Sequence, residues 1–327
     1  MMHWLALAAA FALSQGDPAD PAGAGDPPAR GEAADIVDPG EITTIEMERE
    51  RNRRLTVPVI IGGEGPFRFL VDTGAQATVL SSELADSLQL TDRSAATLVG
   101  TASSRPVETT FIPDFTLGER TFAVRTAPIV DAANIGDADG ILGVDSLQDQ
   151  RVLLDFEQGV MRVSDNFGSG GSNGYDIVVR ARERLGQLII HRAEIDGIRT
   201  AVIVDTGAQA SIGNPALLRR MRSRTAIEDT LMTDVNGVQL VGPTRIARRL
   251  DIGRVQLANT PIAFADAPTF HALGLGDRPA LILGMNELRL FSRVAIDFRS
   301  RRVLFDVPGT EGRVQNWNFN ERATRLD

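Results

Sequence analysis

Asp72-Thr73-Gly74-Ala75-Gln76 occurs a second time in this chain as Asp205-Thr206-Gly207-Ala208-Gln209, 133 positions later. Each copy follows an apolar run, Phe67-Arg-Phe-Leu-Val71 in the first case and Thr200-Ala-Val-Ile-Val204 in the second. A strand that ends in a carboxylate and a glycine turn is therefore predicted twice. Two equivalent carboxylates on two equivalent scaffolds predict a carboxylate pair at the boundary between two halves of the chain.

The repeat extends upstream of this motif. In each half a first strand, a turn and the apolar run together read as a β-hairpin. Gly62-Gly63 and Asp196-Gly197 supply the two turns. The predicted strands cover residues 55–61 and 67–71 in the first half and residues 188–195 and 200–204 in the second.

The repeat also extends downstream. A short helix is predicted over residues 81–88 with Ser81 as its cap, and its counterpart has Asn214 as cap and Pro215 at the first helical position. Polar, Gly-bearing stretches at 99–106 and 233–239 read as hairpin tips that fold over a cleft, although surface hairpins have the same pattern.

A second motif recurs later in each half. Gly140-Ile-Leu-Gly-Val-Asp-Ser-Leu147 matches Leu281-Ile-Leu-Gly-Met-Asn-Glu-Leu288, and the strand-like runs 151–156 and 293–298 follow. The order of elements is thus the same throughout both halves.

The composition excludes several classes of site and partner. Without any Cys, the chain has no thiol nucleophile, disulfide or Cys-based zinc site. The histidines, His3, His191 and His271, are too few to predict a histidine-rich metal cluster, and nothing suggests a metal or organic cofactor. A formal net charge of −9 argues against nucleic acid or an anionic membrane as the main partner.

The first residues predict export. Residues 4–13 form an apolar core of ten residues, too short to span a bilayer, and the small residues Ala12 and Ser14 suit signal-peptidase cleavage. We expect a periplasmic or extracellular protein. The alternative is a buried first helix, because the segment before the core has only the terminal amine and His3 in place of Lys or Arg. No other segment is apolar enough to cross a membrane.

The chain is predicted to have six parts. Gly, Pro, Ala and Asp dominate the leader, and Gly, Ser and Asn dominate the linker, without apolar periodicity. In the polar tail, Trp317 and Phe319 are candidates for docking on the body. The parts are a signal peptide (1–14), a disordered leader (15–42), a first lobe (43–165), a linker (166–174), a second lobe (175–308) and the tail (309–327).

Two hydrophobic residues before Asp-Thr-Gly-Ala, followed later by Ile-Leu-Gly, resemble the aspartic proteases and especially the retropepsin-like type. The resemblance covers residues 55–308. It implies a mainly β fold of two pseudo-symmetric retropepsin-like β-barrel lobes with short helices and an active-site cleft between them. It also implies that the segments 141–143 and 282–284 cross beneath the active-site loops. Retroviral enzymes use two identical chains, whereas this layout resembles the two-lobed, single-chain pepsin-like enzymes.

The resemblance implies an endopeptidase with Asp72 and Asp205 as catalytic residues and a peptide or protein as substrate. Two close carboxyls that share one proton supply both a base for water and an acid for the carbonyl oxygen. Such a pair titrates as a unit, so neither residue is assigned permanently as acid or base.

The rest of each motif has an expected supporting role. By resemblance, the hydroxyls of the two threonines hydrogen-bond across the lobe interface, and the glycines let the backbone approach each carboxylate. Gln76 and Gln209 depart from the usual family strings and are candidate substrate contacts. The predicted supporting residues are Thr73, Gly74, Ala75, Thr206, Gly207 and Ala208.

Other carboxylates are weaker candidates. Asp155 and Asp297 recur symmetrically at the ends of predicted strands, where a turn or an Arg-pairing role is expected. Asp145 aligns with Asn286 of the second half and therefore has no carboxylate counterpart. The Arg-rich stretches 219–224 and 245–254 are expected to be solvated faces.

Three alternatives to the leading hypothesis remain open at this point. The first is a catalytically silent peptide-binding module with the same cleft. The second is a glycosidase, whose acid and base carboxylates stand several ångströms apart. The third is pairing of each lobe with a lobe of another chain, although we expect a monomer that pairs its own two lobes.

Overall fold

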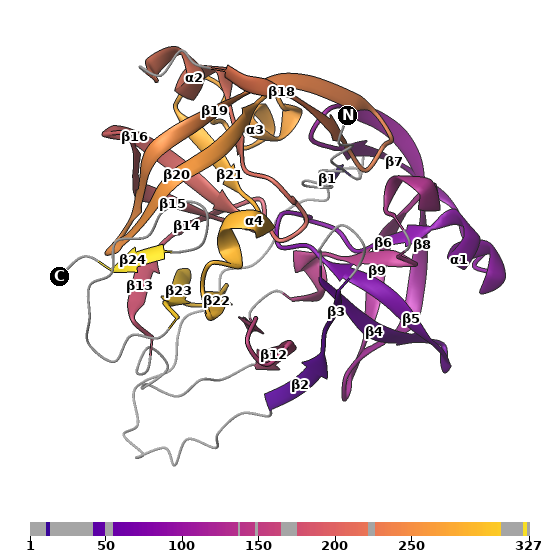
Figure 1. Cartoon of the computed structure of the whole chain (residues 1–327). Coiled ribbons are helices and arrows are strands. Elements are labelled where there is room, and N and C mark those ends of the chain that lie inside the picture. Colours follow the sequence, from indigo (N-terminus) through magenta and orange to yellow (C-terminus); the bar gives the residue numbers. More distant parts are fainter. Residues whose placement is uncertain are drawn as a thin grey trace, which may run out of the picture.

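The computed structural model describes residues 11–13, 42–49, 55–136, 138–147, 150–164, 175–221, 226–308 and 323–325. Strands dominate these residues and the described helices have six residues or fewer, so the predicted mainly β class is confirmed. The chain forms two lobes that lie above a shared sheet (Figure 1).

Six strands of the first lobe pair in a closed ring. Around the ring they are β4 (Leu55–Ile61), β5 (Glu64–Val71), β10 (Gly140–Leu142), β6 (Val79–Ser81), β9 (Arg120–Val130) and β8 (Ser104–Leu117). Outside it, β7 (Ser94–Val99) pairs with β8, β1 (Phe11–Leu13) with β7, and β3 (Glu48–Arg49) with β4. The remaining elements are α1 (Ser82–Ser87), η1 (Ala132–Asn134) and η2 (Val144–Ser146).

The second lobe repeats this ring. Its strands are β15 (Gln187–Ile195), β16 (Ile198–Val204), β21 (Ala280–Leu283), β17 (Ile212–Gly213), β20 (Val255–Phe264) and β19 (Gln239–Ile252). At its edges, β14 (Arg182–Arg184) pairs with β15, β18 (Ala226–Thr233) with β19, and β24 (Ala323–Arg325) with β20. The helices are α2 (Pro215–Arg220), α3 (Pro268–Ala272) and α4 (Met285–Leu288).

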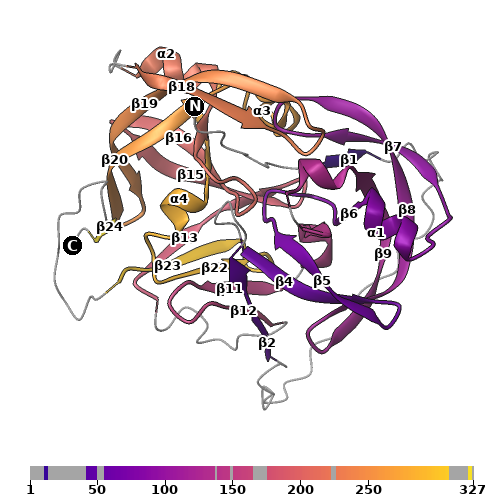
Figure 2. The ribbon, with the colours of Figure 1, turned by 45° about the vertical axis from the view of Figure 1, so that its right-hand side comes forward.

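A six-stranded sheet, which was not predicted from the sequence, joins the lobes. The runs that follow the two Ile-Leu-Gly motifs pair with each other, with Arg151 opposite Asp297 and Asp155 opposite Arg293. In order, the strands are β13 (Ile177–Arg180), β23 (Arg302–Asp306), β22 (Arg293–Asp297), β11 (Arg151–Asp155), β12 (Val160–Ser164) and β2 (Ile42–Glu46). The antiparallel pairing of β11 with β22 places the pseudo-two-fold axis between the lobes (Figure 2).

Apolar side chains fill both barrels. In β4, Leu55, Val57, Val59 and Ile61 are buried, while Pro58 between them is exposed, as expected for a strand with one face in a core. Phe69 of β5 lies edge-on to Phe115 of β8, with ring centroids 5.3 Å apart. A continuous cluster of buried residues extends from the first barrel through the joining sheet into the second.

The predicted local elements are close to the observed ones. The hairpin strands are β4 with β5 and β15 with β16, although β5 begins at Glu64 and β16 at Ile198, earlier than predicted. Both helix caps are present, since Ser81 Oγ accepts Leu84 N–H at 3.1 Å and Asn214 Oδ1 accepts Leu217 N–H at 2.9 Å.

Several predictions concern residues beyond the described ranges. These are most of the signal segment and leader, the linker 166–174, Trp317 and Phe319, so the limits of these parts remain predictions. Within the described part of the chain, no helix combines the length and hydropathy needed to span a membrane.

Candidate active site

Asp72 and Asp205 lie at the ends of β5 and β16, on loops that meet between the lobes. Below each loop runs its Ile-Leu-Gly segment, because β10 pairs in parallel with β5 and β21 with β16. Asp72 N–H donates to Leu142 O at 3.1 Å, and Asp205 N–H donates to Leu283 O at 3.0 Å. The predicted crossing beneath both loops is therefore present.

Two backbone N–H groups orient each carboxylate. Asp72 Oδ1 accepts from Gly74 N and Ala75 N at 2.8 and 2.9 Å. Asp205 Oδ1 accepts from Gly207 N and Ala208 N at 2.9 and 3.1 Å. Because both aspartates are only 1% exposed, these donors fix the carboxylates in a site largely closed to solvent.

The two glycines bring the carboxylates together across the interface. A β-carbon added to Gly74 would lie 2.5 Å from Asp205 Oδ2, and one added to Gly207 would lie 2.6 Å from Asp72 Oδ1. Each glycine therefore makes room for the carboxylate of the opposite lobe, which sharpens the sequence expectation.

The two threonines join the loops by four buried hydrogen bonds. Thr73 Oγ1 donates to Val204 O at 3.0 Å and accepts from Thr206 N at 3.2 Å. Thr206 Oγ1 donates to Val71 O at 2.7 Å and accepts from Thr73 N at 3.0 Å. These are the cross-lobe contacts that the resemblance implies, and they lie within a single chain.

The two carboxyls interact electrostatically. Burial raises the pKa of Asp205 well above that of an ordinary aspartate, and the negative charge of Asp72 and a hydrogen bond between the two side chains raise it further. The N–H groups of Ala208 and Gly207 act in the opposite direction. The pair is thus arranged to retain a proton that an isolated, solvated aspartate would lose.

The comparison with protein families gives two matches to aspartyl proteases, over residues 57–146 and 191–286. Together they cover more than half of the chain. The chain belongs to the aspartyl protease family. The comparison with curated proteins finds no match. Because the family match occurs twice, one in each lobe, the resemblance to retropepsin-like proteases and the duplication are both confirmed.

Hairpin tips from the two lobes of this member of the aspartyl protease family meet each other (Figures 1 and 2). The first tip, residues 100–103, joins β7 to β8, and the second tip, residues 234–238, joins β18 to β19. Asp234 Oδ2 accepts from Ala102 N at 3.2 Å and from Ser103 Oγ at 2.7 Å. Asn236 Nδ2 donates to Ser103 Oγ at 2.9 Å, so polar contacts hold the tips together.

Val99, the last residue before the first tip, and Val235 of the second tip belong to apolar clusters of the opposite lobe. Val99 belongs to an apolar cluster with Ala208 and other second-lobe residues, and Val235 belongs to a cluster with Ala75 and other first-lobe residues. Both alanines of the repeated motif are fully buried. Ala75 and Ala208 therefore belong to the same apolar clusters as Val235 and Val99, respectively.

Some supporting residues were missed by the sequence reasoning. Gln187 of β15 is fully buried and its Nε2 donates across the lobes to Gly74 O. Thr78 and Ser211 stand six positions after Asp72 and Asp205, and their hydroxyls accept Gly143 N–H and Gly284 N–H, both at 3.1 Å. Aligning the repeats would have found the two hydroxyls, whereas nothing in the sequence distinguishes Gln187.

The two predicted substrate contacts lie in different surroundings. Gln76 is partly buried, and its Oε1 has no hydrogen bond to any described residue. Gln209 is 7% exposed, and its backbone carbonyl accepts Asn286 N–H at 2.9 Å. Their role toward a substrate remains a prediction.

Asp155 and Asp297 have both roles expected from the sequence. Asp297 Oδ2 accepts from Arg151 Nε at 3.0 Å, and its Oδ1 accepts Ser300 N–H at 2.7 Å in a turn. Asp155 pairs with Arg162 at 3.4 Å and accepts Gln158 N–H at 2.8 Å. These residues hold the joining sheet and do not enter the carboxylate pair.

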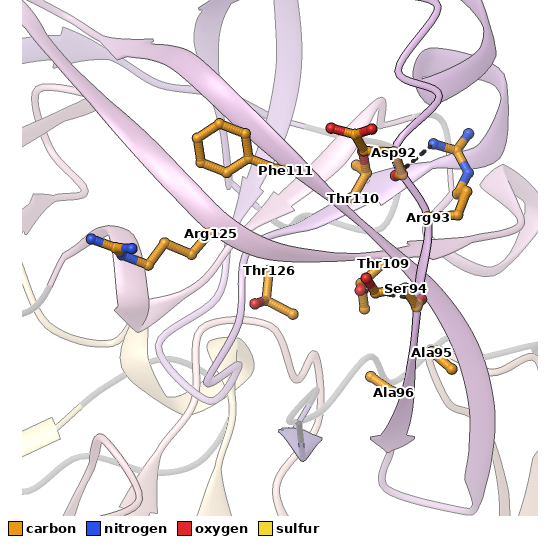
Figure 3. A pocket seen from close by; sticks show the side chains of 10 residues that line it. All are labelled: Asp92, Arg93, Ser94, Ala95, Ala96, Thr109, Thr110, Phe111, Arg125 and Thr126. Carbon is orange, nitrogen blue, oxygen red and sulfur yellow. Dashed lines mark hydrogen bonds between the residues drawn. The ribbon is translucent and has the colours of Figure 1, made fainter. Parts of the chain in front are cut away.

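A cavity of about 510 Å³ lies on the first lobe (Figure 3). Strands β7, β8 and β9 form it, and Figure 3 shows Phe111 and Arg125 on one side and Arg93 on the other. Neither aspartate lines this cavity, so we assign it no part in the site. Its lining is Asp92, Arg93, Ser94, Ala95, Ala96, Thr109, Thr110, Phe111, Arg125 and Thr126.

Proposed function

We propose that this chain is an aspartic endopeptidase that activates water between Asp72 and Asp205. The observation that carries the proposal is the meeting of two buried carboxylates across the lobe interface. Each has its own pair of N–H donors, and each lies against the glycine of the other lobe. A glycosidase pair is disfavoured because its two carboxyls need a separation of several ångströms.

The chemistry follows from one proton shared by two carboxyls. The ionised carboxyl takes a proton from water as the water oxygen attacks the peptide carbonyl, while the protonated carboxyl donates to the carbonyl oxygen. The raised pKa of Asp205 favours the singly protonated pair. Collapse of the tetrahedral intermediate breaks the C–N bond, and a carboxyl returns a proton to the leaving amine.

An extended peptide or protein segment is the proposed substrate. It would lie between the carboxylate pair and the two hairpin tips, so the tips must separate before it enters. The Oε1 of Gln76 is buried and has no hydrogen bond within the described ranges, which supports a role as acceptor for a substrate N–H group. Gln209 is proposed as its counterpart in the second half of the site.

Exchange of either aspartate tests the proposal. We expect Asp72→Asn and Asp205→Asn each to lower kcat for a peptide library by about 10²–10⁴-fold, because each removes one member of the acid-base pair. Circular dichroism should show both variants folded. Undiminished turnover in either variant would exclude the shared mechanism.

The same library separates the leading proposal from a silent peptide-binding module. Binding without cleavage between acidic and neutral pH would favour the module. We also propose that the protein is exported and acts as a monomer. The apolar segment 4–13 supports the first proposal, and the presence of both half-sites in one chain supports the second.

A further inference from the structure

Glu287 is a buried carboxyl beneath the second half-site, and the proposed chemistry does not use it. It lies in α4 and is 1% exposed. Ser211 Oγ lies 2.5 Å from Glu287 Oε2. Its other oxygen, Oε1, makes no hydrogen bond to any described residue. Such a group is costly to ionise, because a buried charge needs partners.

Ser211 links this carboxyl to the loop that carries Asp205. Its Oγ accepts Gly284 N–H at 3.1 Å, and α4 holds the same loop through two backbone bonds. Met285 N–H donates to Ala208 O at 2.8 Å, and Asn286 N–H donates to Gln209 O at 2.9 Å. Ala208 in turn donates its N–H to Asp205 Oδ1. A shift of α4 is therefore transmitted to the carboxylate through two consecutive hydrogen bonds.

In the first lobe, the carboxyl that lies beside the corresponding support is Asp145, and its surroundings differ from those of Glu287. Thr78 Oγ1 donates to Asp145 Oδ1 at 2.7 Å, and Ser146 N–H donates to the same oxygen at 2.8 Å. Asp145 has an exposed side chain, although burial of its carboxyl still raises its pKa against the lowering effect of the bonds from Thr78 and Ser146. Among the described residues, only the Ser211 hydroxyl and the residue's own backbone N–H bond the Glu287 carboxyl, which is 1% exposed. Ionisation of the second-lobe carboxyl must therefore disturb its surroundings more.

We propose that Glu287 is a positioning residue whose neutral form holds the loop of Asp205 in place through Ser211 and α4, which makes the second half-site sensitive to pH. This inference rests on the proposed function, because its catalytic readout needs an active carboxylate pair. When Glu287 ionises, water and compensating groups are drawn toward the buried charge, and α4 moves from the loop.

The groups around Glu287 do not offset its charge. Burial raises its pKa to about 7, and the hydrogen bond with Ser211 and its own backbone N–H lower it only in part. The nearest charged residues along the two packed segments are Asp205 on the loop and Arg289 after α4. The causes of the raised pKa are burial, Ser211 and the backbone N–H of Glu287, and none of these is a charged side chain.

The test compares Glu287→Gln with the full-length parent between pH 5 and 8.5. Gln keeps the shape of the side chain and cannot ionise. Titration of the carboxylate pair affects both proteins equally. It therefore cancels when kcat of Glu287→Gln is divided by kcat of the parent. That ratio should be near 1 at pH 5 and rise to about 10 at pH 8, one unit above the pKa, where about nine-tenths of Glu287 is ionised.

Glu157→Gln is the matched control. Glu157 Oε1 also accepts from a serine hydroxyl at 2.5 Å, from Ser292, but it is exposed and lies far along the chain from both motifs. Its kcat ratio to the parent should stay flat across the pH range. A flat ratio for Glu287→Gln, in an active protein, would overturn the inference.

Hydrogen exchange gives a second readout that needs no catalysis. After correction for intrinsic exchange, residues 205–211 of the parent should lose protection above pH 7, and those of Glu287→Gln should not. This difference in a protein without peptidase activity would reject the proposed function and retain the positioning role. Equal protection in both proteins would reject the positioning role, whatever the activity.

Discussion

Replacing Thr73 by Val removes one hydroxyl from the lobe interface and nearly preserves the shape of the side chain. In the native protein, Thr73 Oγ1 donates to Val204 O at 3.0 Å and accepts from Thr206 N at 3.2 Å. The methyl group of Val can do neither. Both backbone groups would then remain in a buried interface without these hydrogen bonds.

The expected cost follows from these two groups. A buried donor or acceptor left without its partner costs about 1–3 kcal/mol, so Thr73→Val should lower the free energy of unfolding by about 2–6 kcal/mol. That is a large part of the 5–15 kcal/mol, roughly, that stabilises a typical domain. Urea denaturation curves monitored by fluorescence measure this change in the free energy of unfolding directly.

Two further variants make this measurement specific. Thr206→Val removes the symmetrical pair of bonds, to Val71 O and Thr73 N, and should cost a similar amount. Thr116→Val removes a hydroxyl that pairs with Thr121 at 2.7 Å on the surface of a hairpin, and should cost less than about 0.5 kcal/mol. If the free energy of unfolding of Thr73→Val lay within roughly 1 kcal/mol of that of the parent, the argument from buried backbone groups left without hydrogen bonds would be refuted.

Three other perturbations test neighbouring parts of the site. Gly74→Ala should lower kcat by at least about 10²-fold without unfolding the chain, because its β-carbon would collide with the Asp205 carboxylate and displace the pair. Asp234→Ala should accelerate hydrogen exchange at Ala102 and in the rest of the first tip by at least about tenfold, because the tips lose their shared acceptor. Glu287→Gln should raise the free energy of unfolding by about 3 kcal/mol above pH 7 and leave it unchanged below about pH 4.5.

The sign of the last effect comes from linkage. The folded pKa of Glu287, about 7, exceeds its usual value of 4.5, so unfolding releases a proton between these two pH values. Stability therefore falls as pH rises through this window and is then constant. If the free energy of unfolding had the same pH dependence in Glu287→Gln and in the parent, this prediction would be wrong.

The other two predictions also have controls. Gly197→Asn adds a side chain in open space, at a turn whose φ of +79° Asn tolerates, and should retain activity. Asp131→Ala removes a cap bond to Ala133 N at 2.8 Å at the surface and should leave exchange at the tips unchanged. Loss of activity in the first control, or faster exchange at the tips in the second, would show that the effects are not local.

The repeated motif made the barrels and the carboxylate pair predictable because these features depend on local sequence. A strand that leads into Asp-Thr-Gly and a later Ile-Leu-Gly segment specify the same crossing in both halves. The hairpin turns and the caps at Ser81 and Asn214 follow from the same kind of local signal. Each can be read within one short segment.

Contacts between distant segments were not predictable in this way. The pairing of β11 with β22 joins runs more than a hundred residues apart, and neither run indicates its partner. Asp234 looks like any turn residue until the two tips are brought together. Alignment of the halves correctly gave Asp145 no carboxylate counterpart, because Val144 and Met285 bond equivalent carbonyls and Asn286 follows Met285. It did not show that Glu287, which corresponds to Ser146, is a buried carboxyl beneath the second loop.

The supports of the two half-sites have diverged while the repeated motif has not. Gln187 donates a hydrogen bond to Gly74 O in the first half-site. The buried Glu287 lies beneath the second half-site, whereas Asp145 beneath the first has an exposed side chain. A shared proton requires two carboxyls that are close, but it does not require identical surroundings. Unequal supports make the two proton positions unequal in energy. The symmetry of the motif therefore accounts for the meeting of Asp72 and Asp205, and we expect the asymmetry beneath it to bias which of them holds the proton.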